Sequence, residues 1–276
     1  KDIKKCPIKL IKQQKKNKKL HKTDMEQGHW VLAKLGKRVL RPGGLELTRL
    51  MLDEMDINKA DDVVEFAPGL GQTARLTVTH QPHSYTAIEL NKAAAERVRK
   101  NVSYPHMRVV NADAAQTGLP DGCASKVYGE AMLTMQSAPQ KEAIVKEAAR
   151  LLKPGGLYGI HEIVILHNDT SANVQRTVEK DLTASIKTNV RPLTTDGWRT
   201  LLEDNGLEIV AMHQNPMHLL EWRRVVADEG WCGFLRIVTR LLCHPTARKR
   251  VLEMRSTFRK HEKNIDAICI IARKKA

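Results

Sequence analysis

The chain of 276 residues lacks the features that mark several classes of protein. It contains no run of 18 or more uncharged apolar residues, so we expect no membrane-spanning helix. Its first residues are rich in lysine and include no apolar segment, so they do not resemble a secretory signal peptide. The five cysteines are scattered without C-x-x-C spacing, which argues against a disulfide framework and a structural zinc site. A reducing, cytoplasmic setting is the simplest expectation.

Other absences narrow the organisation of the chain. Neither H-x-x-x-H nor H-E-x-x-H occurs, so we expect no metal site. Internal repeats and Pro- or Ser-rich linkers are also missing, which favours one core with insertions over two independent domains. The length suits one large α/β domain.

The net charge of +15 belongs to the two ends of the chain. Residues 1–24 hold ten lysines against two acidic residues, and residues 244–276 hold ten basic against three acidic residues. The span between them is neutral, which argues against a basic groove around a central site. We expect 1–24 to be a flexible arm, either merely solvated or in contact with RNA or an anionic membrane.

Short apolar runs recur at a regular interval and alternate with helical patterns. The predicted strands are residues 62–67, 84–90, 107–113, 125–131 and 156–165, followed by 207–213 and 266–274. Alternation of this kind predicts right-handed βαβ units and an α/β fold with helices on both faces of the sheet. Insertions near 166–193 and 214–264 have helical spacing and predict a helical cap within the domain 25–276.

The stretch "VVEFAPGLGQTARL" joins the first predicted strand to a helix. Gly69, Gly71 and Ala74 fit the G-x-G-x-x-A pattern of a dinucleotide site. Read from Glu65, the same letters give E-x-A-P-G-x-G instead, which suggests a different cofactor. Glycine in this turn lets the backbone approach a ligand closely.

Acidic residues end the next three predicted strands. Glu89 stands where a carboxylate can accept hydrogen bonds from both ribose hydroxyls. Asp113 stands where a carboxylate can meet an adenine amino group, and Glu130 lies on the floor between them. Because ligands bind beyond the carboxyl ends of parallel strands, these residues should converge.

This arrangement resembles the class I S-adenosylmethionine-dependent methyltransferases, especially the small-molecule type that includes ubiquinone and menaquinone C-methyltransferases. The resemblance covers roughly residues 60–165 and implies a Rossmann-like sheet of seven strands, the last antiparallel. It assigns cofactor contacts to Glu65, Ala67, Pro68, Gly69, Gly71, Glu89, Leu90, Asp113, Ala114 and Glu130. Ala67 replaces the family's first glycine, and Pro68 follows it. NAD is the rival cofactor, but no role in its fingerprint matches Asp113 or the Pro-Gly-Gly turn before the fifth strand.

Methyl transfer is an in-line displacement that mainly requires alignment of the acceptor, and a general base is optional. His161 and Glu162 lie near the end of the fifth strand and face opposite sides of the sheet. One of them could act as a base at the pocket. The alternative is a pair with structural hydrogen bonds.

The resemblance also implies that N-terminal helices fold over the cofactor, so His29 and Trp30 could close the pocket. The alternative is a helix-start histidine and a core tryptophan. Met132 follows the fourth predicted strand, and His213 is the last residue of the sixth. Both could contact the acceptor. A polar loop would explain His213 equally well.

The sequence thus predicts a methyltransferase that modifies a small, partly apolar acceptor under a helical lid. Alternatives are a methyltransferase that acts on RNA or protein, recruited by the basic ends, and a non-catalytic S-adenosylmethionine-binding module. The apolar cap could instead pack on the core or form a homodimer.

Overall fold

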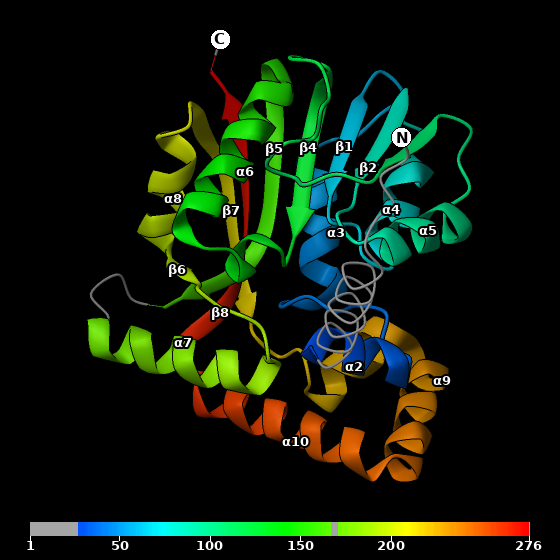
Figure 1. The fold of residues 1–276 in the computed structure, drawn as a ribbon, viewed down its shortest axis with the longest axis vertical. Coiled ribbons are helices and arrows are strands. Elements are labelled where there is room, and N and C mark those ends of the chain that lie inside the picture. Colours follow the sequence, from blue (N-terminus) through cyan, green and yellow to red (C-terminus); the bar gives the residue numbers. More distant parts are fainter. Residues whose placement is uncertain (1–26, 167–170, 276) are drawn as a thin grey trace, which may run out of the picture.

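The structure is a computed structural model that describes residues 27–166 and 171–275, and for His29 the backbone alone. The segment 1–24, expected to be a flexible arm, lies outside the described residues. Within the described part, one eight-stranded sheet forms the centre of the molecule (Figure 1). Its strands are β1 (Asp62–Phe66), β2 (Ser84–Ile88), β3 (Met107–Val110), β4 (Ala124–Glu130), β5 (Leu152–Ile165), β6 (Leu193–Thr194), β7 (Leu207–Pro216) and β8 (Ile265–Lys274).

The strand order is β3-β2-β1-β4-β5-β8-β7, and β6 pairs with β5 off this path. The pairs from β3 to β5 are parallel, whereas β8 is antiparallel to both β5 and β7. The carboxyl ends of β1 to β5 therefore meet at one edge of the sheet, where an α/β protein holds its ligand.

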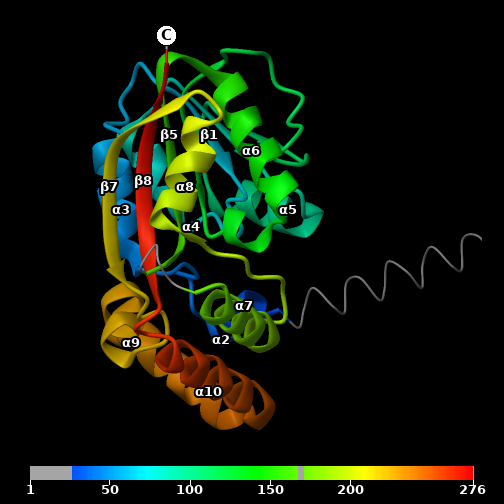
Figure 2. The same cartoon turned by 90° about the vertical axis from the view of Figure 1, so that its left-hand side faces the viewer.

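Helices cover both faces of the sheet and its carboxyl edge. The described helices are α2 (Gly28–Leu35), α3 (Gly44–Glu54), α4 (Gln72–Thr77), α5 (Lys92–Asn101), α6 (Ala138–Leu151), α7 (Ala172–Ile186), α8 (Thr195–Glu203), α9 (Trp222–Cys243) and α10 (Pro245–Lys260), with 3-10 turns η1 (Val78–His80) and η2 (Leu133–Met135). Apolar side chains of α3, α4 and α5 share one core cluster, and those of α6 and α8 share another. Figure 2 shows α3 and α8 on opposite sides of β8.

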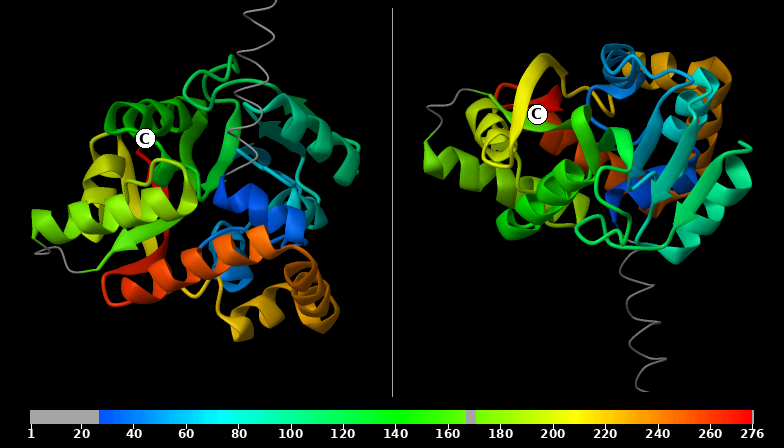
Figure 3. Two further views of the ribbon diagram at one scale, coloured as in Figure 1. Left: turned by 60° about the horizontal axis from the view of Figure 1, so that its bottom comes forward. Right: turned by 90° about the horizontal axis from the view of Figure 1, so that it is seen from above.

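The cap consists of α2, α7, α9 and α10, which lie below the carboxyl edge of the sheet in Figure 1 and come forward in the left view of Figure 3. It has its own apolar cluster, in which Leu32, Leu182 and Phe258 join the end of β5 through Ile163. Gly230 interrupts α9 with non-helical angles (φ 72°, ψ 169°). This kink makes the residues that follow it a separate helical segment.

The predicted α/β fold with helices on both faces is confirmed. The expected strands are all present, and β8 is antiparallel as the resemblance implied. The prediction of seven strands missed β6, because a strand of two residues leaves no periodic pattern in the sequence. Both insertions, near 166–193 and 214–264, are largely helical. No helix in the described part of the chain is long and apolar enough to cross a membrane.

Candidate active site

The turn after β1 exposes its backbone at the carboxyl edge. Ala67, Gly69 and Gly71 all have positive φ angles, of 51°, 56° and 74°. A Cβ atom added to Gly69 would meet no heavy atom closer than 3.9 Å, so the space beside this glycine is open. Ala67 adopts the left-handed conformation although it has a Cβ atom, which costs about 1–2 kcal/mol. The turn keeps the path that a glycine would take and leaves room for a ligand.

Glu89 ties this turn to the end of β2. Its Oε2 accepts a hydrogen bond from the Gly69 amide at 3.1 Å, and its Oε1 accepts one from the Asn91 amide at 2.9 Å. Burial raises the pKa of Glu89, although these two amides oppose the shift. Each carboxylate oxygen still has an acceptor position for a ribose hydroxyl.

The residues assigned to the adenine lie beside Glu89. Leu90 is 69% exposed, so its side chain could cover one face of a base. Asp113 accepts a hydrogen bond from the Ala115 amide at 2.9 Å and one from the Gln140 side chain at 3.3 Å. Ala114 is buried in the core cluster below them. The structure thus brings these three residues to one end of the edge.

Glu65 lies beneath the turn and does not reach its open side. The hydroxyls of Tyr85 and Tyr128 both donate to its carboxylate, and the side chain is 3% exposed. Burial raises the pKa of Glu65 to about 7, against the two tyrosine hydrogen bonds. It therefore supports the turn from below, in a closed trio of side chains.

Glu130 is the centre of a polar network at the end of β4. It accepts hydrogen bonds from Thr48 of α3 at 2.5 Å and from Thr73 of α4, and it pairs with Arg41 at 3.2 Å. His161 Nδ1 lies 2.8 Å from the same carboxylate. Burial alone would disfavour its charge, but Arg41 and His161 lower the pKa of Glu130 to about 2.

Arg41 carries a buried donor without a partner. Its Nε lies 2.5 Å from Thr48 and 3.2 Å from Glu130, whereas no hydrogen-bond partner is present for Nη2. A buried guanidinium nitrogen without an acceptor is costly, so it indicates a place for an anionic group. The methionine carboxylate of S-adenosylmethionine is such a group, and the network around Glu130 links Arg41 to the β1 turn through Thr73. Sequence reasoning missed Arg41, because a single arginine before "PGG" matches no motif.

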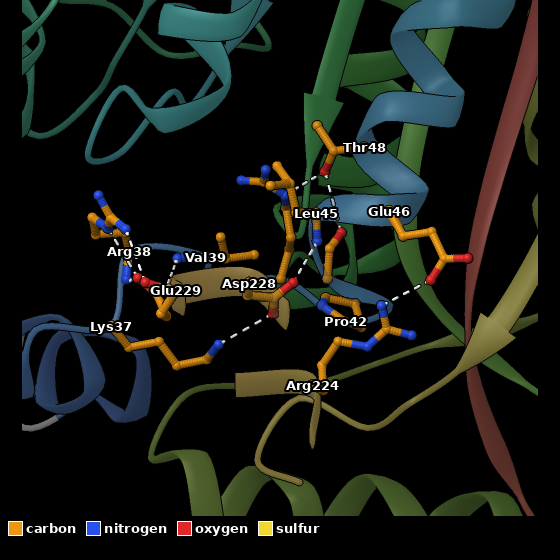
Figure 4. Close-up of polar contacts among 12 residues, drawn as sticks. Lys37, Arg38, Val39, Pro42, Leu45, Glu46, Thr48, Arg224, Asp228 and Glu229 are labelled. Carbon is orange, nitrogen blue, oxygen red and sulfur yellow. Dashed lines mark hydrogen bonds and ion pairs between the residues drawn. The ribbon is translucent and has the colours of Figure 1, made fainter. Parts of the chain in front are cut away.

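Two acidic residues of α9, Asp228 and Glu229, fix the segment that contains Arg41, and we call this pair the cap clamp (Figure 4). Glu229 Oε1 accepts hydrogen bonds from the Arg38 and Val39 amides at 2.6 and 2.8 Å. Asp228 accepts one from the Leu45 amide at 2.9 Å and pairs with the buried Lys37 at 3.4 Å. Both carboxylates are almost fully buried. The cap clamp therefore sets the position of the linker between α2 and α3.

The two candidate bases on β5 do face opposite sides of the sheet. His161 is fully buried, with Nδ1 on Glu130 and Nε2 2.5 Å from the Pro42 carbonyl oxygen. Each ring nitrogen thus faces an acceptor, and neither is free to take a proton from a bound molecule. His161 joins the sheet to the linker that carries Arg41, which is a positioning role.

Glu162 lies on the other face, where its carboxylate accepts four hydrogen bonds. The donors are the amides of Met132, Leu133 and Thr134 and the hydroxyl of Thr134, at 2.7–3.0 Å. Burial raises the pKa of Glu162, and these hydrogen bonds oppose the shift. Glu162 holds η2 in place after β4, and its four partners leave little capacity for proton transfer.

An apolar cavity opens beside the ends of β4 and β5. Ala131, Thr134 and Glu162 form its sheet side. The cap supplies the other walls from α2, α7 and α10, including Leu32, Ile186, Met254 and Phe258. Most of this lining is apolar, so the cavity suits an apolar portion of a small molecule.

The four residues assigned to the substrate do not gather at one place: His29 and Trp30 are neighbours on α2, whereas Met132 and His213 lie elsewhere. The guanidinium group of Arg97 on α5 lies 5.4 Å from the centre of the Trp30 ring. Met132 is buried in the core cluster and His213 pairs with Glu54 at 3.0 Å. Trp30, Met132 and His213 do not line the apolar cavity, and the side chain of His29 lies outside the described part of the chain. Within residues 27–166 and 171–275, no three His, Cys, Asp or Glu side chains form a group that could hold a metal ion.

Comparison with known proteins defines the class. Residues 63–156 match a family model described as a methyltransferase domain. An uncharacterized protein of Haemophilus influenzae is 28% identical over 253 residues, which cover 90% of this chain and 98% of that protein. A sterol 24-C-methyltransferase of Neurospora crassa is 28% identical over 127 residues, 44% of this chain and 33% of that protein.

A solved structure shares the fold. It is phosphoethanolamine N-methyltransferase 2 of Haemonchus contortus in complex with phosphomonomethylethanolamine and S-adenosylhomocysteine. The TM-score is 0.67 at 13% identity, and the match covers 90% of this chain and 56% of that one.

Residues 63–156 form a class I S-adenosylmethionine-dependent methyltransferase domain. The chain is accordingly an S-adenosylmethionine-dependent methyltransferase, and the prediction of S-adenosylmethionine over NAD as its cofactor is confirmed. The assignment of the β1 turn to this cofactor stays a prediction. The open turn, the exposed Leu90 and the unpartnered nitrogen of Arg41 fit this cofactor.

Proposed function

We propose that the protein methylates a small molecule whose acceptor atom lies in an apolar surrounding, a class that includes quinone-like rings. The observation that carries this proposal is the cavity between Ala131 at the end of β4 and the cap helices α2, α7 and α10. The same β4 end adjoins the cofactor edge, so a molecule in the cavity would lie next to the methyl donor. Apolar walls exclude water and favour a close approach of the acceptor.

The cofactor would lie along the carboxyl edge with its parts held by separate residues. Glu89 would bind the ribose, Leu90 would cover the adenine, and Arg41 would pair with the carboxylate. When bound, S-adenosylmethionine supplies an electrophilic methyl group. The chain's own part is to position the two molecules and to keep water out.

Proton transfer by the chain has little support in this arrangement. Glu162 lines the cavity but accepts four hydrogen bonds, and His161 faces two acceptors. The geometry therefore favours acceptors that are nucleophilic in water or that lose their proton easily. We expect substitutions at these two positions to lower stability more than they alter the pH dependence of turnover.

Methyl transfer can be measured as S-adenosylhomocysteine release with a panel of small phenols, quinols and thiols. A cavity-filling variant, Leu32→Trp, should lower turnover of the active acceptor while S-adenosylmethionine binding stays unchanged. Val210→Trp, at an exposed position of β7 that does not line the cavity, is the matched control. Equal loss of activity in both variants would contradict the assignment of the cavity. Absence of release with every acceptor, despite tight cofactor binding, would favour a binding module instead.

A further inference from the structure

Large apolar side chains are exposed mainly on two helices of the cap. Of the eight that are exposed within the described residues, five lie on α9 and α10: Trp222, Trp231, Leu235, Leu242 and Leu252. The exposed fractions of Trp231 and Leu242 are both 64%. Single exposed apolar residues need no explanation, but a group of this kind on adjoining helices indicates an interaction surface.

Four residues after the Gly230 kink form a continuous line, which we call the α9 stripe. Trp231, Leu235, Val238 and Leu242 are spaced by four, three and four residues, the spacing of one helix face. The opposite face contacts the rest of the cap, since Ile237 is buried and Arg240 donates a hydrogen bond to the Lys34 carbonyl oxygen at 3.2 Å. The α9 stripe therefore points away from the protein.

The surface around the α9 stripe is basic, although four of its basic residues pair with acidic residues outside residues 222–260: Arg224, Arg255, Arg259 and Lys260. Residues 222–260 contain ten arginines and lysines and three acidic residues. Two of those acidic residues, Asp228 and Glu229, are buried in the cap clamp, so they contribute little to the outer charge. Arg248 and Lys249 are exposed at the start of α10, directly after the end of the α9 stripe.

An occupant of this surface must combine negative charge with an apolar interior. A second copy of the chain would bring an equally basic surface into contact, which opposes self-association. A tryptophan and leucines on one helix face, next to arginine and lysine, match the helices that lie in the headgroup region of anionic bilayers.

We propose that the α9 stripe and the basic start of α10 dock on the surface of an anionic lipid bilayer. Trp231, Leu235 and Leu242 enter the headgroup region, and Arg248 and Lys249 contact lipid phosphates. The inner face of α10, with Met254 and Phe258, is a wall of the apolar cavity. Docking would thus bring this wall of the cavity near the lipid. The inference rests on the outer surface of the cap and does not depend on which acceptor the protein methylates.

The test is flotation of the full chain with vesicles of phosphatidylcholine plus phosphatidylglycerol, compared with phosphatidylcholine alone. We expect binding to the anionic vesicles, with partitioning reduced about tenfold in Trp231→Ser/Leu235→Ser/Leu242→Ser. Arg248→Glu/Lys249→Glu should reduce it to a similar extent and weaken its salt dependence. The control Val174→Ser/Val210→Ser removes exposed apolar side chains from α7 and β7 and should bind as the wild type does.

Unchanged S-adenosylmethionine binding and thermal unfolding show that each variant is folded. Tryptophan emission should shift to the blue on binding in the wild type and shift less in Trp231→Phe. Equal vesicle binding by wild type and stripe variant would overturn the proposal, since another segment would then carry the contact. A dimer in sedimentation that the stripe variant dissociates would also overturn it, as would retention of RNA but not of vesicles.

Discussion

The two sides of the cofactor edge are built in different ways. On the sheet side, Glu89 accepts a hydrogen bond from the amide of Gly69, which lies 20 positions earlier in the chain. Both residues belong to a motif that is visible in the sequence. On the cap side, Glu229 holds Arg38 and Val39 across 191 and 190 positions, with side chains that belong to no motif. A local motif thus shapes the β1 turn, whereas long-range contacts fix the linker on the cap side.

The largest effect is expected within the sheet side, at Glu162. Glu162→Ala removes the acceptor of three buried amides and one hydroxyl, so we expect the free energy of unfolding to fall by about 3–5 kcal/mol. Urea unfolding measures this change, and Glu142→Ala on the exposed side of α6 is the control. A loss below about 1 kcal/mol would show that the η2 amides find other partners.

Glu65 gives the sheet side a pH-dependent stability near neutral pH. Its folded pKa of about 7 exceeds the usual value of 4.5, so the folded state binds more protons and stability falls as pH rises between these values. The decrease should be about 3 kcal/mol and absent in Glu65→Gln, whose amide oxygen still accepts from the tyrosines. Urea unfolding at several pH values checks this. Parallel pH curves for the two proteins would be the contrary result.

Glu229→Ala tests the cap side. The Arg38 and Val39 amides lose their acceptor, so we expect a loss of stability of about 2–3 kcal/mol. Because the same linker carries Arg41, affinity for S-adenosylmethionine should fall as well, whereas Glu253→Ala on the exposed side of α10 should change neither. Reduced stability with unaltered cofactor affinity would mean that the cap clamp does not position Arg41.

Glu89→Ala should affect binding more than folding. Each hydrogen bond to a charged group contributes about 1.5–3 kcal/mol, so loss of one ribose contact weakens S-adenosylmethionine about 10- to 150-fold. Calorimetric titration gives the Kd, and Glu96→Ala on the exposed side of α5 is the control. An unchanged Kd would place the ribose elsewhere.

The smallest effect is expected at Ala67. Ala67→Gly relieves the positive φ of 51° at the cost of greater freedom in the unfolded chain, so a net stabilisation of about 0.5 kcal/mol is expected. Ala60→Gly, at a loop position without positive φ, should destabilise slightly. Thermal unfolding distinguishes the two signs, and destabilisation at Ala67 would indicate that its Cβ atom makes a contact worth more than the strain.

Periodicity and turn glycines were enough to predict the sheet, its covering helices and the glycine turn after β1. They also placed His161 and Glu162 on opposite faces of one strand. They could not show that both side chains are taken up by structural hydrogen bonds, because the partners lie far away in the sequence: Glu162 accepts from η2, and His161 faces the Pro42 carbonyl oxygen of the α2–α3 linker. Arg41 was missed for the same physical reason, because burial of its Nη2 without a hydrogen-bond partner depends on residues that are distant in the sequence.

The central claim is that S-adenosylmethionine lies between the β1 turn and Arg41, with its methyl group toward the apolar cavity. A crystal structure with S-adenosylhomocysteine measures this most directly. We expect the carboxylate within hydrogen-bond distance of Arg41 Nη2, the ribose on Glu89, and the sulfur toward Ala131. A carboxylate remote from Arg41, or a sulfur that faces away from the cavity, would contradict it.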